Sequence, residues 1–478
     1  MLPQISFLSP EEQEHIHQAA LWLLSNVGMR FPSCEALEIM RKAGAKIEDE
    51  NIVKIPAELV TYAMEKAPKR EGFVLYGREE KHDIHFGVDT PVLGSMRSAT
   101  HVLDLETRER RLCTNKDVAD MVRLMDALKN THIPAPTALP QDVPKDTADW
   151  YAIATTLKNT SKPIMATAAG AGFVKDTVRM GSLIVGSEQK YRERPFIFFT
   201  ILTFCPFQID RLSLEAMVES SRQNIPVAVS SGPILGLTST VTIAGALAQI
   251  HSEILACLVL TQLVRAGAPF IYTSFARSFD MKTVNIAMSS PEYAILKGAL
   301  GQMGRYLDLP VRMPAFLRDA KILDGQAGFE TAMVGLVSAL ASDVLDGLQY
   351  DMDTLVDLAD FVFSDEAMGA LKRIARGFTI DENTMPLELM KEVGYGGSFL
   401  SSRHTVQNFR KEIWTPRLME RRDWEQWEKD GKKDIEQRSR EKAKEILSSH
   451  KPTPIAPEIE AEIDQIALEA KIDYAQKN

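Results

Sequence analysis

The residues best suited to chemistry gather in one short stretch, residues 318–330, which reads RDAKILDGQAGFE. An extended run ends just before it, and a helix rich in small residues is expected to follow. In parallel α/β proteins, catalytic and binding groups lie in such strand-to-helix turns. The candidate catalytic residues are therefore Asp319, Lys321, Asp324, Gln326 and Glu330. The alternative is structural, with Asp324 capping the helix and Lys321 and Glu330 solvated.

Aromatic rings and basic side chains stand near the ends of the predicted strands. Rings around a pocket suit a quaternary ammonium ion, because this cation has no N–H and is held only by π-faces and carboxylates. Arginine suits a carboxylate on the same substrate. The candidate substrate-binding residues are Phe204, Tyr272, Phe275, Arg277, Arg312, Phe316, Tyr350 and His404. The alternative is that most of these rings belong to the core.

Several familiar catalytic motifs are absent from the sequence. It contains no Ser-His-Asp spacing, nucleophile elbow, P-loop or HExxH. Residues 168–173 are glycine-rich but lack the third glycine of a nucleotide fingerprint, so they are interpreted as a turn. His82 and His85 would point to opposite faces of a strand, so no metal site is expected. A missing nucleophile is informative if a cofactor supplies it.

Composition excludes some classes of partner. The chain has 478 residues, 45% hydrophobic and 25% charged, with a net charge of −10, so nucleic acid and anionic membrane surfaces are disfavoured. Four cysteines without CxxC spacing indicate reduced core residues. The most apolar segment, residues 244–263, is interrupted by His251 and Glu253, and no segment reaches the roughly 18 apolar residues of a membrane span. A cytoplasmic protein is expected.

A repeat of apolar run, turn and helix begins near residue 115, with a period of about 30 residues. Seven units are clear, and residues 399–405 are the predicted eighth strand. The pattern predicts a TIM (β/α)8 barrel, with a doubly wound sheet as the rival fold. The predicted domains are an N-terminal helical cap (1–70), a small β segment (71–114), the barrel (115–409) and a C-terminal helical extension packed on it (410–478).

At this point the chain resembles a known family, the trimethylamine methyltransferase family of corrinoid-dependent enzymes. Several motifs carry the resemblance by their order and spacing. They are residues 104–111 (DLETRERR), 140–144 (PQDVP), 319–330, 392–400 (EVGYGGSFL), His404-Thr405, 414–418 (WTPRL), Arg421-Arg422 and Trp427.

The resemblance implies a TIM barrel that moves a methyl group from an amine nitrogen to the Co(I) of a separate corrinoid protein. No cofactor is expected to be bound permanently, and self-association is expected. Members that use trimethylamine carry pyrrolysine, whereas every residue here is standard. This favours the branch for quaternary amines such as glycine betaine, proline betaine, carnitine or γ-butyrobetaine. The alternatives are a Schiff-base lyase or aldolase using Lys321 and a non-catalytic betaine-binding protein.

Overall fold

Parallel strands form the centre of the computed structural model, which describes residues 3–89 and 91–470. Eight of the strands in this part of the chain pair in parallel, in the order β9-β6-β17-β16-β13-β12-β11-β10. Three further strands extend the sheet beyond β17, in the order β18-β7-β8. The parallel strands are β6 (Val92–Gly94), β9 (Thr131–Ile133), β10 (Ile164–Thr167), β11 (Ile197–Leu202), β12 (Val227–Ser231), β13 (Phe270–Ser274), β16 (Val311–Leu317) and β17 (Val344–Tyr350). The added strands are β18 (Leu355–Asp357), β7 (His101–Leu103) and β8 (Arg110–Leu112).

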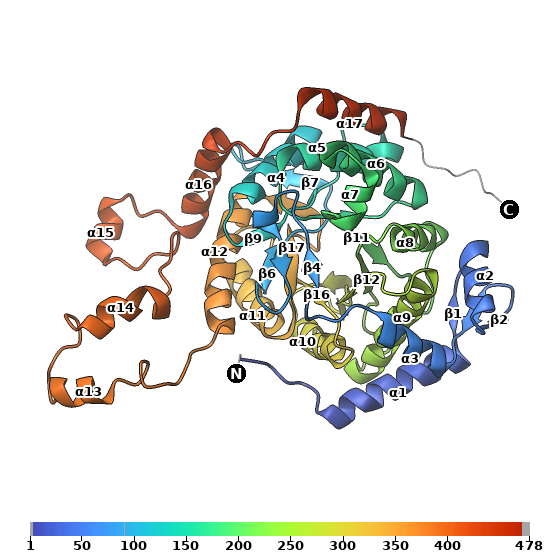
Figure 1. The fold of residues 1–478 in the computed structure, drawn as a ribbon. Helices are drawn as coiled ribbons and strands as arrows, with labels where there is room; N and C mark the ends of the chain where they lie inside the picture. The colour runs from blue at the N-terminus through green and yellow to red at the C-terminus, as the bar shows by residue number, and fades with distance from the viewer. Residues whose placement is uncertain (1–2, 90, 471–478) are drawn as a thin grey trace.

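Helices surround this sheet (Figure 1). Each contacts the next along the chain, and the last contacts the first. They are α4 (Asn115–Ala127), α5 (Ala148–Asn159), α6 (Ala171–Val185), α8 (Arg211–Arg222), α9 (Ile243–Val264), α10 (Pro291–Tyr306), α11 (Gly325–Ala341) and α12 (Leu358–Ala375). The molecule is therefore mixed α/β with a central parallel sheet, and strands and helices alternate as the sequence predicts.

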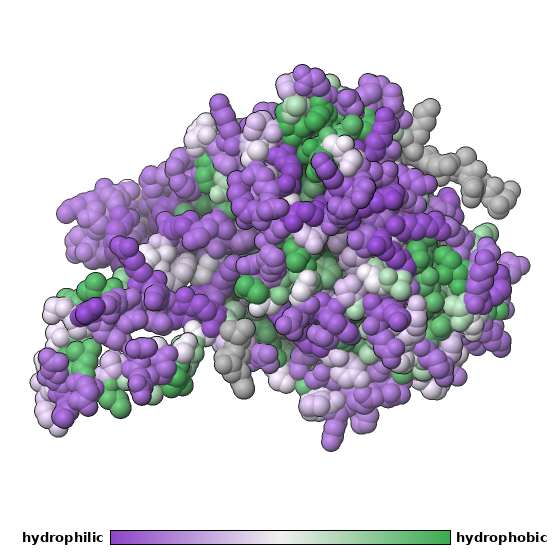
Figure 2. Space-filling view, in the orientation of Figure 1, coloured by the Kyte–Doolittle hydropathy of each residue, from purple (hydrophilic) through white to green (hydrophobic). Residues whose placement is uncertain are grey.

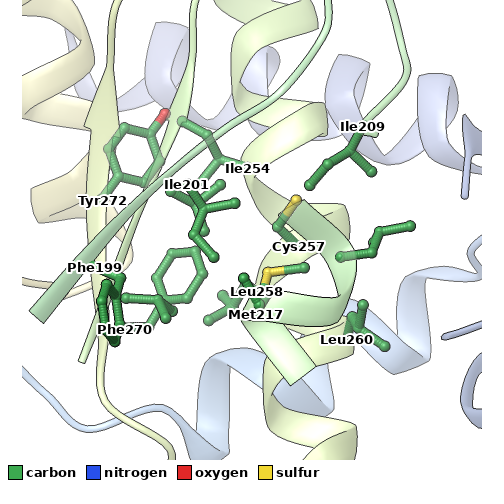
Figure 3. Close-up of a cluster of buried hydrophobic side chains, with 14 of the residues drawn as sticks. Phe199, Ile201, Ile209, Met217, Ile254, Cys257, Leu258, Leu260, Phe270 and Tyr272 are labelled. Atoms are coloured by element: carbon green, nitrogen blue, oxygen red, sulfur yellow. The ribbon is translucent and has the colours of Figure 1, made fainter. Parts of the chain in front are cut away.

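Helix α9 fills the layer between the sheet and the N-terminal elements. It is the one helix in the described ranges that is long and apolar enough to cross a membrane, but 83% of its most apolar window is buried inside the protein. Ile254, Cys257 and Leu258 pack against Phe199 and Phe270 of the strands (Figure 3). A helix that is apolar on every side is stable in water when protein covers it on every side.

The N-terminal segment covers α9 from outside. Its helices α1 (Pro10–Asn26), α2 (Cys34–Lys42) and α3 (Ala57–Lys66) all contact α9. A small sheet of β1 (Met29–Arg30), β3 (Ile52–Lys54) and β2 (Lys46–Glu48) joins them. Helix α1 is capped by Ser9, whose side chain forms a capping box with that of Glu12.

A short hairpin closes the N-terminal ends of the parallel strands. Its strands β4 (Val74–Leu75) and β5 (Ile84–His85) are antiparallel. Side chains of the hairpin pack in one cluster with Val92, Phe198 and Val344, near the starts of β6, β11 and β17. Asp83 forms an ion pair with Arg194 (2.8 Å), just before β11.

The predicted eighth strand at residues 399–405 was wrong. Ser402 accepts a hydrogen bond from the backbone N–H of Thr405 (3.2 Å) and starts helix α14 (Arg403–Glu412). The eighth parallel strand is β6, which lies in the 71–114 segment that was predicted to be separate. Three buried residues are too short a run to display a periodicity.

The C-terminal part continues in helices. Helix α13 (Leu387–Val393) and α14 stand away from the ring of helices (Figure 1). Helix α16 (Ile435–Ser449) packs on α12 and α4, and α17 (Pro457–Glu469) packs on α5 and α6. The remaining elements are η1 (Glu80–His82), η2 (Lys145–Thr147), α7 (Glu188–Glu193), β14 (Ser278–Asp280), β15 (Asn285–Ala287) and α15 (Trp424–Lys429).

Candidate functional site

The turn at residues 318–330 is held together by its own side chains. Buried Glu330 accepts hydrogen bonds from the backbone N–H groups of Asp319 (3.1 Å) and Ala320 (3.2 Å), and from Gln326 Nε2 (2.7 Å). Asp324 accepts from the N–H of Ala327 (3.0 Å), which confirms the predicted helix cap. The carboxylates of Asp324 and Glu330 therefore stabilise this turn through hydrogen bonds.

Asp319 and Lys321 also have partners within the protein. The Asp319 carboxylate accepts from the N–H groups of Met288 (2.9 Å) and Ser289 (3.1 Å), which tie the loop before α10 to the end of β16. Lys321 is 60% exposed and forms an ion pair with Asp351 (2.8 Å). A Schiff-base lysine needs a depressed pKa, which burial supplies. An exposed, ion-paired Lys321 therefore gives no support to the aldolase alternative.

Three of the aromatic rings in the predicted substrate-binding set lie on the face of the sheet that is covered by the helices. Tyr272 lies among the side chains between the sheet and α9 (Figure 3), with its hydroxyl 3.1 Å from His251 Nδ1. The Tyr350 hydroxyl donates to Asp360 of α12 (2.8 Å), and Phe316 packs in the same cluster as Tyr350. These positions differ from the predicted pocket. Alternation along β13 turns Tyr272 toward the helices. The irregular register between β16 and β17, at Pro314 to Leu317, turns Phe316 and Tyr350 to the same side.

Two other predicted residues lie outside the sheet. Phe204 follows β11 and is 59% exposed. His404 is on α14, where its Nε2 lies 2.9 Å from the carbonyl oxygen of Asn383.

The opposite face of the parallel strands, which we call the inner face, carries polar groups. Phe198, Ala228, Ile271 and Val344 pack together there with Phe275. Residues two positions further along each strand share that face, so Thr200, Ser230, Thr273 and Asp346 also belong to it.

A buried ion pair crosses the inner face. Arg312 Nε donates to Asp346 Oδ2, and both side chains are almost completely buried. Burial raises the pKa of Asp346, whereas the charge of Arg312 opposes that shift. The second carboxylate oxygen of Asp346, Oδ1, has no hydrogen-bond partner within the described chain. Arg312, one of the predicted substrate-binding residues, therefore lies on the inner face with its guanidinium already paired.

Phe275 and Arg277 form the edge of the inner face beyond β13. The Arg277 guanidinium carbon lies 4.5 Å from the centre of the Phe275 ring, and Nη2 donates to the carbonyl oxygen of Gly232 (3.1 Å). Burial lowers the pKa of Arg277, while the nearby Asp353 acts to raise it. Its buried Nε has no partner among the described residues.

Further unpartnered polar atoms lie on the same face. They are Thr200 Oγ1, Ser230 Oγ and Gln349 Oε1. Gln349 is oriented by its amide nitrogen, which donates to Met96 O (2.5 Å) and Ser98 Oγ (3.0 Å). Each buried polar atom without a partner costs about 1–3 kcal/mol. Their concentration on one face indicates that a bound molecule or water satisfies them.

A strained turn after β17 brings a carboxyl group to this site. Asp351, Met352 and Asp353 have φ of 55°, 53° and 78°, a conformation that non-glycine residues rarely adopt. Asp353 accepts a hydrogen bond from Ser98. Burial raises the pKa of Asp353 to about 7, although Ser98 and Arg277 act against the shift. Strain of this kind costs about 1–3 kcal/mol per residue and concentrates at functional sites.

The structure adds a residue that was not chosen from the sequence. Glu253 of α9 is fully buried and accepts hydrogen bonds from Thr203 Oγ1 (2.7 Å), Ser231 Oγ (2.8 Å) and the N–H of Phe207 (2.9 Å). It fixes the ends of β11 and β12. The signal was its position as a charge inside an otherwise apolar segment.

Comparison with known proteins gives the chain a family. The profile of the trimethylamine methyltransferase family (MTTB) matches residues 1–471. The chain belongs to this family. It is therefore a methyltransferase, and the resemblance stated from its sequence motifs is confirmed. Membership overturns the lyase and binding-protein alternatives.

Relatives within the family are named for different substrates, trimethylamine or glycine betaine. The trimethylamine methyltransferase MttB of Desulfitobacterium hafniense (strain DSM 10664 / DCB-2) is 31% identical over 469 residues, covering 98% of this chain and 94% of that protein. The glycine betaine methyltransferase of Desulfitobacterium hafniense (strain Y51) is 29% identical over 469 residues, covering 97% and 96%. MttB of Methanosarcina barkeri is 26% identical over 492 residues, covering 99% and 96%.

Proposed function

We propose that this family member is a TIM-barrel enzyme that demethylates a quaternary amine of the betaine type and methylates the Co(I) of a separate corrinoid protein. Glycine betaine, proline betaine, carnitine and γ-butyrobetaine are the substrates to consider. The product would be the corresponding tertiary amine. We expect the enzyme to act in the cytoplasm.

Two contacts support closure of the sheet into a barrel. The N–H of Met165, in β10, donates to the carbonyl oxygen of Pro134, which directly follows β9 (3.2 Å). This hydrogen bond links β10 to the residue that follows β9. The continuous ring of helices, closed by the contact between α12 and α4, agrees with this arrangement.

The proposed substrate class rests mainly on two buried groups of opposite charge, Asp346 and Arg277, each of which has one polar atom without a partner in the described chain. Asp346 Oδ1 would attract a quaternary ammonium group, and Arg277 Nε would bind a carboxylate. A betaine has both groups in one small molecule. Because the hairpin of β4 and β5 packs on the N-terminal end of the inner face, the substrate would enter from the carboxyl ends of the strands.

The proposed methyl transfer needs little general acid or general base catalysis from the protein. A quaternary nitrogen already carries the positive charge that lets a tertiary amine leave. The inner-face residues would bind and orient the substrate, exclude water, and aim one methyl group at the open end of the barrel. The partner's corrinoid would supply the Co(I) nucleophile when it is docked.

The carboxyl ends of the strands offer a surface on which such a partner can dock. Exposed large apolar side chains follow β11, β12, β13 and β16 there, and exposed groups of this kind mark interaction sites. They are Phe204, Leu237, Val241, Met281, Val284, Ile322 and Phe329.

Incubation with the Co(I) form of the cognate corrinoid protein and a panel of amines tests the proposal. We expect absorbance changes of methyl-Co(III) formation with at least one betaine. Methylation from trimethylamine, with every betaine inactive, would contradict the assignment to quaternary amines.

A further inference from the structure

Residues 377–413, which we call the arm, extend away from the body of the protein, and no other part of the described chain buries the side chains of their helices. The arm carries α13 and α14, and it extends beyond the ring of helices (Figure 1). Neither helix has a buried residue. Helices shorter than about 12–15 residues are marginal in water unless one face is packed. The arm therefore needs a surface outside its own chain segment.

The exposed side chains of the arm are large and apolar. Phe378, Leu387, Tyr395, Leu400, Val406 and Phe409 are among them, and hydrophobic colour is visible on this part of the molecule in Figure 2. Together the apolar side chains of the arm expose on the order of 1,000 Å², against the about 800 Å² per partner that a stable interface buries. The apolar surface of the arm is therefore comparable in size with one side of a stable interface.

A basic cleft of about 1590 Å³ opens at the N-terminal ends of the strands, away from the candidate site. Its lining contains eleven Lys and Arg residues but four Asp and Glu residues, although the whole chain has a net charge of −10. Lys129 and Lys372 lie in this lining. Burial lowers the pKa of Lys372, and Asp89 and Asp365 act to raise it.

The distal part of the arm, residues 378–400, has the complementary charge. It contains Asp381, Glu382, Glu388 and Glu392, with Lys391 as its basic residue. Glu388 is almost fully exposed. A seven-residue helix such as α13 fills roughly 800 Å³, so the cleft has room for it. Opposite charges on the two surfaces favour their association and fix its orientation.

We propose that two copies of this chain exchange arms, so that the acidic helix α13 of each arm occupies the basic cleft of the other copy. The root of the arm, including Arg410 and Lys411, lines the cleft of its own chain, whereas the distal part turns away from it. Exchange between two copies buries both surfaces with one symmetric contact. The inference does not depend on the identity of the methyl donor.

Charge reversal on each side tests the exchange. The arm variant is Glu388→Lys with Glu392→Lys, and the cleft variant is Lys129→Glu with Lys372→Glu. Each variant alone brings like charges together, so we expect its dimer dissociation constant to rise at least tenfold. The control variant, Glu58→Lys with Glu65→Lys on α3, should behave like the wild type. Light scattering after size exclusion measures all four proteins.

Mixing the arm variant with the cleft variant is decisive. Both contacts of the mixed dimer again pair opposite charges, so we expect a dimer as stable as the wild type, and this recovery shows that both variants are folded. A wild type that remains monomeric at every concentration would overturn the proposal. Variants that associate like the control, or a mixture that does not recover, would overturn it as well.

Discussion

At the scale of single residues, the inner face carries both a carboxylate, Asp346, and the guanidinium groups of Arg312 and Arg277. Asp346 is held by Arg312, and Arg277 is held over Phe275, yet each keeps one buried polar atom free of partners in the described chain. The two fixed arginines are preorganised, because their hydrogen bonds and ring contacts restrict their orientation. Recognition of a zwitterion would then depend on Arg277 for its carboxylate end.

Replacement of Arg277 by Leu is expected to affect carboxylated substrates selectively. Loss of a buried, charge-assisted contact costs about 2–5 kcal/mol, so KM for a betaine should rise at least tenfold. Choline and tetramethylammonium lack the carboxylate, and their KM should change little. Steady-state kinetics on both classes gives the comparison, with Arg192→Leu on the surface as the matched control.

Equal losses on both substrate classes would assign a structural role to Arg277. Its hydrogen bond to Gly232 would then be the important contact.

Asp353 should give the reaction a pH dependence near neutrality. Its pKa of about 7 means that the carboxyl group is protonated below that pH and ionised above it. The ionised form competes with the substrate carboxylate for Arg277, so KM for a betaine should rise as the pH passes 7. Asp353→Asn should remove this dependence. A variant with the wild-type pH profile would contradict the assignment.

The same shift also has a consequence for stability. The pKa in the folded protein is higher than in the unfolded chain, so the folded state keeps its proton between about pH 4 and 7. This group therefore lowers the free energy of unfolding as the pH rises through that range, and its contribution is constant above it.

The sequence indicates which residue types could form the proposed site, but it does not indicate the face of the sheet on which each one lies. Phe275, Arg277 and Arg312 lie at the inner face, whereas Tyr272 and Tyr350 face the helices. Strands that are buried on both sides carry no alternation of polar and apolar residues. Sequence spacing alone therefore gave no means of assigning each ring to one face.

At the scale of elements, a buried ion pair joins β16 to α12. Arg318 donates to Asp360 (2.6 Å) and to Ser364 (2.8 Å), and its guanidinium lies over the Tyr350 ring. Both charged side chains have 0% exposure, so removal of one leaves an uncompensated charge in the core.

Asp360→Asn should therefore destabilise the protein by about 3–5 kcal/mol. Urea unfolding measures the change. Glu38→Gln removes an exposed ion pair with Lys42 and serves as the control, with an expected effect below about 1 kcal/mol. Similar small effects for both variants would show that Arg318 finds other partners.

Most elements could be predicted because their signals are local. The caps at Ser9 and Asp324 and the alternation of strands and helices are of this kind. Strand β6 depends on distant contacts. Residues 92–94 form a strand because β17 and β9 flank them, and residues 399–405 contain a helix cap that a strand interpretation ignores.

At the scale of the whole molecule, the two ends of the sheet have different roles. The carboxyl ends carry the proposed substrate site and exposed apolar side chains, whereas the N-terminal ends are closed by a hairpin beside the basic cleft. Methyl transfer and arm exchange would therefore occupy separate surfaces, and both contacts can exist at the same time.

A single-turnover reaction with methyl-¹³C-labelled glycine betaine, proline betaine, carnitine or γ-butyrobetaine tests the central claim most directly. With the Co(I) corrinoid protein as acceptor, NMR should detect one equivalent of a tertiary amine for each labelled methyl group that reaches cobalt. Transfer from none of the four, together with conversion of labelled trimethylamine to dimethylamine, would contradict the account.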